Sequence, residues 1–301
     1  MSVVVSQLTK IFDEQKAVDH ISFEVKTGDV LGFLGPNGAG KSTTMKMITC
    51  FIPPTSGSVT VCGYDTISQQ NEVKKKIGYL PESNPLYYDM YVREYLAFIA
   101  SLHTNIIKKK QRIAEMIHAT GLEREKTKKI GALSKGYKQR VGLAQAMLHN
   151  PDVLIMDEPT SGLDPNQLVE IRNLIKNLSK EKTIILSTHI MQEVKALCNR
   201  VVIINKGKLV ADDDIETLQQ SGRQQIITKV TFKEQVAENA LTSLPHVDRA
   251  ESNDQLEWKL FSSHTIQESV FRFAVEHNKT IISLQQETQD LEDVFRKLTQ
   301  S

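Results

Sequence analysis

The segment Gly35–Thr43 constrains the fold of this chain more strongly than any other part of its sequence. It reads G-x-x-x-x-G-K-S-T, it follows the apolar run Val30–Leu34, and it precedes Met45–Ile48, which is apolar at helical spacing. Phosphate-binding loops of this type lie between a strand and the start of a helix. The alternative is a glycine-rich loop that matches by chance, but a chance match would not be expected to have both a strand before it and a helix after it. The sequence therefore predicts a nucleotide-binding site in an α/β fold.

The glycines, the lysine and the serine of this segment can each be explained by the binding of phosphate groups. Gly35, Gly38 and Gly40 let the backbone approach a ligand and turn its N–H groups towards phosphate oxygens. The helix that begins near Lys41 adds its positive N-terminal end, the Lys41 ammonium can reach the β- and γ-phosphates, and the Ser42 hydroxyl can bind Mg²⁺. The residues predicted to hold the nucleotide are Gly35, Pro36, Asn37, Gly38, Ala39, Gly40, Lys41, Ser42 and Thr43.

Two apolar residues upstream of the loop are further candidates. Phe12 and Val18 could form a flat platform for a purine ring, because stacking on an aromatic side chain tolerates any base. Ordinary packing of Phe12 is the alternative. Both residues are included among those predicted to bind the nucleotide.

Composition and charge exclude several classes of protein. The 301 residues contain 37 Lys and Arg against 36 Asp and Glu, and such a balance argues against a dedicated nucleic-acid binder. The first residues, Met1–Ser6, lack the basic flank and apolar core of a signal peptide, and no apolar run reaches the ~18–20 residues that cross a bilayer. Three widely separated cysteines indicate reduced thiols. We therefore expect a cytoplasmic chain that does not itself span a membrane and has no nucleic-acid partner.

The order of apolar patterns indicates an α/β core with added parts. Val3–Ser6 and Ile21–Val25 alternate like strands of an antiparallel sheet. Residues from about 85 to 147 are mostly helical, which suggests a helical subdomain inserted into the core. Continuous apolar runs that alternate with helices are typical of strands buried in a parallel sheet, and they lie at Val153–Glu158, Thr183–Ser187 and Val201–Ile204.

A polar, glycine-containing stretch at Gln219–Gly222 suggests a linker. It divides the chain into a nucleotide-binding domain at 1–218 and a small α+β domain at 223–301. In the second domain the pattern predicts a strand, a helix, two strands, a helix and a strand, which is the order of a ferredoxin-like sandwich. A final helix is expected over 291–298. This domain shows no catalytic constellation.

Two carboxylates and a histidine end buried strands, where ligands of parallel sheets bind. Asp157 can hold Mg²⁺ or its waters, and Glu158 can polarise the attacking water. His189 could bind the γ-phosphate and hold the geometry of water and carboxylate; a histidine satisfied within its own loop is the alternative. Glu158 and His189 are therefore the candidate catalytic residues.

These motifs, taken in order with two more, resemble the motif set of ABC-type ATPases over about the first 215 residues. The resemblance assigns Gly35–Thr43 as Walker A, Leu133–Tyr137 as the signature, Val153–Glu158 as Walker B, Ser161–Asp164 as the D-loop and His189 as the switch histidine. Residues 79–82 and 133–165 are similar to ATP-binding subunits of the drug-exporter type. The segment Asn84–Leu96 most resembles the gliding-motility-associated ATP-binding subunit of Bacteroidetes-type bacteria.

The resemblance implies a head-to-tail homodimer around two ATP molecules. Ser134 and Gly136 of one copy, with the helix N-terminus after Gly136, would cap the ATP in the partner's loop, and Asp164 would lie beside it. Ser42, Glu82 and Asp157 would hold Mg²⁺. Glu82 stands where the family usually has Gln, and the signature reads Leu-Ser-Lys-Gly-Tyr instead of Leu-Ser-Gly-Gly-Gln. Neither departure predicts an inactive ATPase.

The resemblance also implies that the chain hydrolyses ATP to drive a separate integral-membrane permease, with export expected by analogy. The chain would then lie at the inner face of the cell membrane. Aromatic and Met side chains favour interfaces, so Tyr87, Tyr88, Met90 and Tyr91 are candidate contacts with the permease, and core packing is the alternative. A soluble mechanical ATPase would usually carry coiled coils or a second cassette. A small-molecule kinase would not need the signature.

Overall fold

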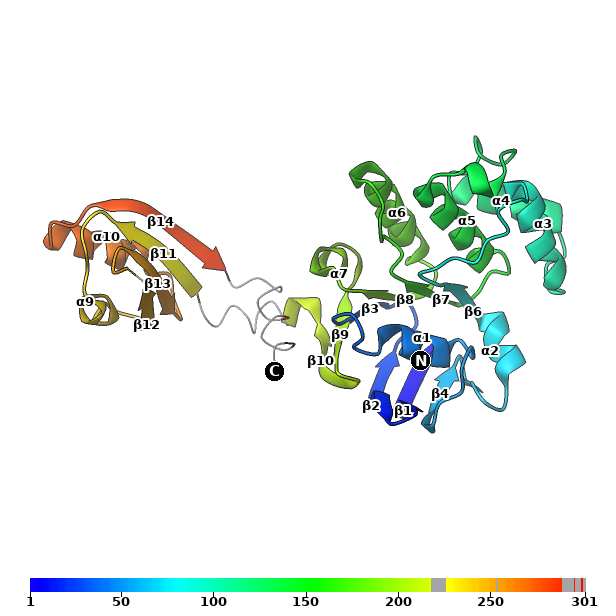
Figure 1. The fold of residues 1–301 in the computed structure, drawn as a ribbon, viewed down its shortest axis with the longest axis horizontal. Coiled ribbons are helices and arrows are strands. Elements are labelled where there is room, and N and C mark those ends of the chain that lie inside the picture. The colour runs from blue at the N-terminus through cyan, green and yellow to red at the C-terminus, as the bar shows by residue number, and fades with distance from the viewer. Residues whose placement is uncertain (218–225, 253, 289–294, 296–298, 300–301) are drawn as a thin grey trace. The chain divides into compact units, whose positions relative to one another are not determined.

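The computed structural model describes residues 1–217, 226–252, 254–288, 295 and 299 (Figure 1). The chain divides into two compact units, Met1–Asp214 and Ile215–Ser301. Each unit is described by itself below. The expected linker at 219–222 and nearly all of the expected helix at 291–298 lie outside the described residues.

A mixed sheet forms the centre of the first unit. Its described strands lie in the order β10-β9-β3-β8-β7-β6, and every neighbouring pair is parallel except β10 and β9. β3, β7 and β8 are buried at every position, as their unbroken apolar runs predict. The strands are β3 Val30–Leu34, β6 Ile77–Leu80, β7 Val153–Asp157, β8 Thr183–Thr188, β9 Arg200–Asn205 and β10 Lys208–Asp214. The predicted mixed sheet is therefore confirmed.

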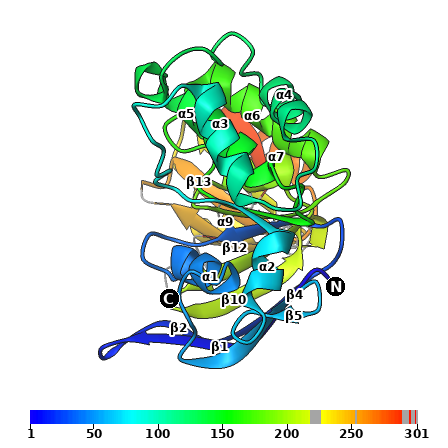
Figure 2. The same ribbon diagram turned by 90° about the vertical axis from the view of Figure 1, so that its right-hand side faces the viewer.

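An antiparallel sheet, ordered β2-β1-β4-β5, packs beside it, as predicted (Figure 2). Its strands are β1 Val3–Phe12, β2 Gln15–Val25, β4 Ser56–Val61 and β5 Tyr64–Asp65. β1 and β2 are longer than predicted. Their pairing contains register shifts, and these shifts obscure the strand pattern in the sequence. Gln7 adopts φ 49° at one such shift, which interrupts the alternation that marks a strand in the sequence.

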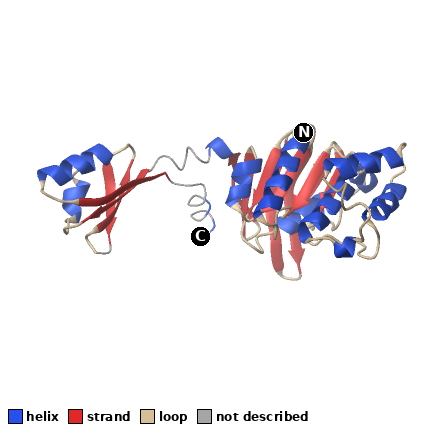
Figure 3. Cartoon of the chain, turned by 90° about the horizontal axis from the view of Figure 1, so that it is seen from above, coloured by secondary structure: helices blue, strands red, loops and turns tan. Residues whose placement is uncertain are grey.

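Helices and the antiparallel sheet cover the central sheet, which has a separate apolar core on each face (Figure 3). Alternate residues of β7 divide between these cores: Leu154 and Met156 pack with the helical part, whereas Val153 and Ile155 pack with α1 and the antiparallel sheet. The helices are α1 Lys41–Ile48, α2 Gln70–Lys76, α3 Val92–Leu102, α4 Lys109–Ala119, α5 Lys135–Met147, α6 Pro165–Leu178 and α7 Met191–Leu197, with a 3₁₀ turn at Ile130–Ala132. α5 begins at Lys135 and not after Gly136, because Ser134 caps it.

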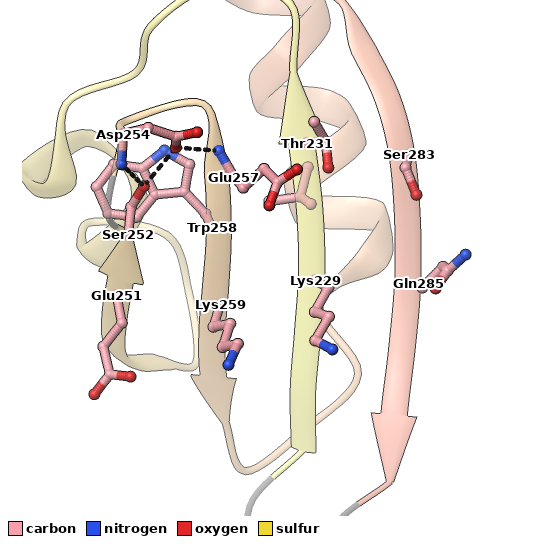
Figure 4. A pocket seen from close by; sticks show the side chains of 11 residues that line it. Lys229, Thr231, Glu251, Ser252, Asp254, Glu257, Trp258, Lys259, Ser283 and Gln285 are labelled. Atoms are coloured by element: carbon pink, nitrogen blue, oxygen red, sulfur yellow. Dashed lines mark hydrogen bonds between the residues drawn. The ribbon is translucent and has the colours of Figure 1, made fainter.

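The second unit contains an antiparallel sheet in the order β12-β13-β11-β14. Its described elements are β11 Ile226–Phe232, α9 Glu238–Thr242, β12 Val247–Ser252, β13 Glu257–Ser262, α10 Gln267–Glu276 and β14 Ile281–Thr288. Trp258 and Leu260 pack with Phe273 of α10 on one face. The other face is polar and lines a cavity of about 470 Å³ with residues that include Lys229, Lys259 and Glu257 (Figure 4).

His149 is buried at the junction between α5 and β7. Its Nε2–H donates a hydrogen bond to the Ile77 carbonyl oxygen at 3.0 Å, and its ring stacks on His103 with centroids 4.5 Å apart. Burial, assisted by His103, lowers the pKa of His149 from 6.5 to about 4. The folded state therefore holds this imidazole neutral at pH values where the unfolded chain already binds a proton.

This shift predicts acid-sensitive stability. The contribution of neutral, buried His149 to the free energy of unfolding is fully present above pH 6.5 and is lost as the pH falls towards 4. We expect the free energy of unfolding of the first unit to fall by about 2 kcal/mol from this group between pH 7 and pH 5. Urea unfolding should show a smaller pH dependence for His149→Gln, whereas exposed His118→Gln should behave as wild type. Equal slopes for His149→Gln and wild type would contradict the assignment.

Candidate nucleotide-binding site

The phosphate loop connects β3 to α1 at an edge where the backbone is tightly packed. Gly40 has φ +111°, and a Cβ there would lie 2.5 Å from the Ala17 carbonyl oxygen. A Cβ at Gly35 would overlap the carbonyl oxygen of Ile204. Gly207 N–H donates to the Ala39 carbonyl oxygen at 3.0 Å and fixes the loop from outside. Glycine is therefore required for the loop to take this path.

Lys41 begins α1 and is nearly buried, with 7% of its surface exposed. Its ammonium donates hydrogen bonds to the carbonyl oxygens of Gly35 at 2.7 Å and Pro36 at 3.1 Å. Burial lowers the pKa of Lys41, and the carboxylates of Glu158, Asp157 and Glu82 oppose that shift. The loop thus holds a positive charge at the mouth of a site lined by negative ones.

The ends of β7 and β8 bring Asp157, Glu158 and His189 together. Asp157 accepts a hydrogen bond from the Ser187 hydroxyl, and the Glu158 N–H donates to the Ser187 carbonyl oxygen at 3.1 Å. His189 Nδ1 lies 2.9 Å from Glu158 Oε1. The other oxygen, Glu158 Oε2, is buried and has no hydrogen-bond partner among the described residues. One carboxylate oxygen is thus held by the histidine, and the other has no donor among the described residues.

A cavity of about 370 Å³ joins the phosphate loop to these strand ends. Its lining residues are Ala17, Asn37, Gly38, Gly40, Lys41, Ser42, Thr43, Glu82, Glu158, Ser161 and His189. Ala17 and Ser161 were not among the candidates. Ser161 lies inside the predicted D-loop, so the motif itself could have indicated it, whereas an alanine carries no chemical signal.

Other candidates lie outside the lining of this cavity. Asp157 lies behind it, with only 2% of its surface exposed. Val18 is fully buried in the core between α1 and the antiparallel sheet. Phe12 is 46% exposed near the end of β1, where the Lys10 ammonium lies 5.1 Å from its ring centroid.

The signature and D-loop segments lie side by side, and of the two only Ser161 of the D-loop lines this cavity. Ser134 caps α5 by accepting a hydrogen bond from Tyr137 N–H at 3.4 Å, and Asp164 caps α6 by accepting one from Gln167 N–H at 2.9 Å. A Cβ at Gly136 would overlap the end of the Gln167 side chain, so a larger residue there would require Gln167 to move. Ser134 and Asp164 are both exposed.

The residues present fit the phosphates of a nucleotide. The glycines exclude side chains from the loop, and the N-terminus of α1 and the Lys41 ammonium supply positive charge. Ser42 and Glu82 line the same cavity. Within the described part of the chain, no group of three or more His, Cys, Asp or Glu side chains could hold a metal alone.

Comparison with known proteins identifies the family. The family model for ABC transporters matches residues 18–161. The bacitracin transport ATP-binding protein BcrA of Bacillus licheniformis is 41% identical over 227 residues, which cover 74% of each chain. The linearmycin resistance ATP-binding protein LnrL of Bacillus subtilis is 34% identical and covers 97% of this chain and 96% of its own. The chain belongs to the ABC transporter family. This ABC subunit binds ATP and hydrolyses it to energise a membrane permease.

A solved structure supports the same fold. A dimeric ATP-binding cassette in a post-hydrolysis state, bound to ADP and Pi, matches with a TM-score of 0.65 and 26% identity over 71% of this chain and 98% of that one. The predicted ABC-type fold and ATPase activity are confirmed. The comparisons give no support to the predicted relationship with gliding-motility subunits. No helix in the described part of the ABC subunit is long and apolar enough to cross a bilayer.

The tight packing at Gly40 gives a test of the loop. We expect Gly40→Ala to weaken ATP binding roughly tenfold or more, because relieving the overlap with Ala17 distorts the backbone at a cost of about 1–3 kcal/mol. Gly63→Ala is the matched control, because Gly63 also has positive φ but has no described atom within 4 Å of a Cβ. Titration with a fluorescent ATP analogue measures both. Equal affinities in the two variants would contradict the packing argument.

Proposed function

We propose that this ABC subunit works as a head-to-tail homodimer that holds two Mg·ATP between its copies and drives an export permease. The observation that carries this proposal is the separation of its motifs. Lys41, Glu158 and His189 share one cavity, whereas Ser134 and Gly136 lie outside it. A cavity that its own signature does not complete needs the signature of a second copy. An isologous pair satisfies this need twice.

In this dimer the phosphate loop would bind ATP through backbone N–H groups, the α1 N-terminus and the Lys41 ammonium. The Ser134 hydroxyl and the backbone at Gly136 would contact the γ-phosphate held by the partner copy, with Asp164 beside them. Catalysis would depend mainly on positioning and on stabilising charge.

The attacking water would donate a hydrogen bond to Glu158 Oε2, the oxygen that has no partner among the described residues. His189 would hold the same carboxylate through Oε1 and keep Oε2 turned towards the water. Mg²⁺, when bound, would neutralise charge on the phosphates. Ser42, Glu82 and Asp157 are the residues that would hold it, and the Ser187 hydroxyl orients the Asp157 carboxylate.

The exported cargo is proposed from the relatives. Their names describe bacitracin transport, linearmycin resistance and Nod factor export. We infer a permease that exports a small molecule, with this subunit on its cytoplasmic side at the inner face of the membrane. Gliding motility stays a prediction from segment 84–96 alone.

Exposed aromatic side chains beside the helical part would dock the permease. Tyr87, Tyr88 and Tyr91 are 56%, 53% and 48% exposed, and the Tyr87 ring lies 5.7 Å from that of Phe98. Large exposed aromatic side chains are unusual on a free surface and common in interfaces. Met90 is half-buried against the core, so its contribution is packing.

Two further assignments belong to the same proposal. We place the nucleotide-binding domain at 1–218, with the helical subdomain at about 85–147, and the second domain at 223–301. The order β11-α9-β12-β13-α10-β14, with antiparallel neighbours throughout the described sheet, supports a ferredoxin-like fold for the second domain.

Glu158→Gln tests the catalytic role and the dimer together. We expect ATP binding to be retained, turnover to fall about 100-fold or more with the general base removed, and a dimer to accumulate in Mg·ATP. Size-exclusion chromatography and phosphate release measure these outcomes, and exposed Glu181→Gln is the control. Wild-type turnover would remove Glu158 from this role, and a monomer with bound Mg·ATP would contradict the dimer.

The docking surface is tested by removing its aromatic side chains. Replacing Tyr87 and Tyr91 by Ser should weaken association with permease-containing membranes about tenfold, because aromatic anchors dominate interface energies, while ATP binding stays unchanged. Phe271→Ser, which removes a 62% exposed aromatic side chain of α10, is the control. Sedimentation with membranes from cells that co-express the permease measures the effect. Unchanged sedimentation of the Tyr87 and Tyr91 variant would place the docking surface elsewhere.

A further inference from the structure

A partly buried ion pair joins α6 to α7. Arg172 of α6 donates to both carboxylate oxygens of Glu193 in α7, from Nε at 3.1 Å and from Nη2 at 2.5 Å. The Glu193 side chain is 2% exposed and that of Arg172 is 26% exposed. A carboxylate this deeply buried requires its cation, and a two-bond fork fixes orientation as well as distance.

The position of Glu193 gives this pair a role in the site. α7 begins two residues after His189, and Glu193 lies in its first turn. The segment between β8 and α7 also contains a short turn, in which Ile190 N–H donates to the Thr188 hydroxyl oxygen at 3.1 Å and Glu193 N–H donates to the Ile190 carbonyl oxygen at 3.1 Å. The His189 side chain is 47% exposed, so tight packing does not hold it in place. Its direction therefore depends on the orientation of α7.

The two helices that the pair joins are themselves anchored. α7 packs on β3, where Val194 and Cys198 would lie within 3.2 Å of a Cβ at Gly32. α6 is tied on its other side by an ion pair between Glu170 and Arg140 of α5. The Arg172–Glu193 fork therefore joins α7 to a helix that also contacts α5.

We propose that Arg172 and Glu193 are positioning residues for ATP hydrolysis, which hold α7 so that His189 stays against Glu158. This inference rests on the roles proposed above for His189 and Glu158. Neither residue of the pair lines the nucleotide cavity, so the pair acts on the rate of hydrolysis and not on the affinity for ATP. A Lys at 172 would keep the charge but lose the fork.

The test separates turnover from binding in the full-length protein. Glu193→Gln and Arg172→Lys should each lower kcat roughly 10-fold to 100-fold, as expected when a catalytic group is misplaced, and leave KM and the Kd for ATP within about twofold of wild type. Asp212→Asn is the matched control, because it breaks the comparable fork between Arg200 and Asp212 in the β9–β10 hairpin. Its kcat should equal that of wild type.

A double-mutant cycle shows whether the pair acts through the histidine. Adding Glu193→Gln to His189→Ala should lower kcat no further than His189→Ala alone. A full additional loss in the double variant, or a parallel loss of ATP affinity in Glu193→Gln, would overturn the proposal. If Glu193→Gln does not fold, the Arg172→Lys variant alone decides, and wild-type kcat in that variant overturns the proposal.

The same measurements distinguish this inference from the proposed function. Wild-type turnover in Glu158→Gln or His189→Ala would contradict the catalytic roles themselves. A different result would contradict only the positioning role. In that case Glu158→Gln and His189→Ala would be inactive, whereas Glu193→Gln and Arg172→Lys would keep the wild-type kcat.

Discussion

The parallel register of β3, β7 and β8 is the constraint on which the site depends. Leu34 pairs with Thr188 and Asp157 pairs with Ser187, so the phosphate loop, the carboxylates and the histidine leave the sheet at one edge. At that edge the ammonium of Lys41 meets several carboxylates in partly buried surroundings, where their interaction is stronger than in water. The helices and the antiparallel sheet cover the two faces and leave this edge open to the cavity.

Much of this arrangement can be predicted from the sequence because its signals are local. The strands that end at the site are unbroken apolar runs, and the phosphate loop is a fixed spacing of glycines and a lysine. The first strand is predicted too short because Gln7 has a left-handed backbone conformation at a register shift. Its residue type gives no sign of that conformation. α2 is not predicted, since its lysine-rich sequence carries little periodic signal. Ala17 reaches the cavity through packing of a hairpin, which no local pattern encodes.

The ion pairs of α6 could not be predicted for a different reason. Arg172 and Glu193 are separated by 21 positions and a strand, and each looks like an ordinary charged residue of an amphipathic helix. Only the packing of α6 against α7 shows that Glu193 is buried and that its partner is a planar fork. Motif residues identify what touches the nucleotide. The residues that position those motif residues can be identified only from the three-dimensional structure.

The hydrogen bonds of Lys41 affect how quickly a nucleotide can be captured. Its ammonium is held by the Gly35 and Pro36 carbonyl oxygens, and Gly207 braces the loop from outside. Phosphate oxygens are acceptors of the same kind as those carbonyl oxygens, so a bound nucleotide would take their place as partners of the ammonium. Little conformational entropy is then lost on association, so ligands that carry the same phosphates should differ mainly in how fast they leave.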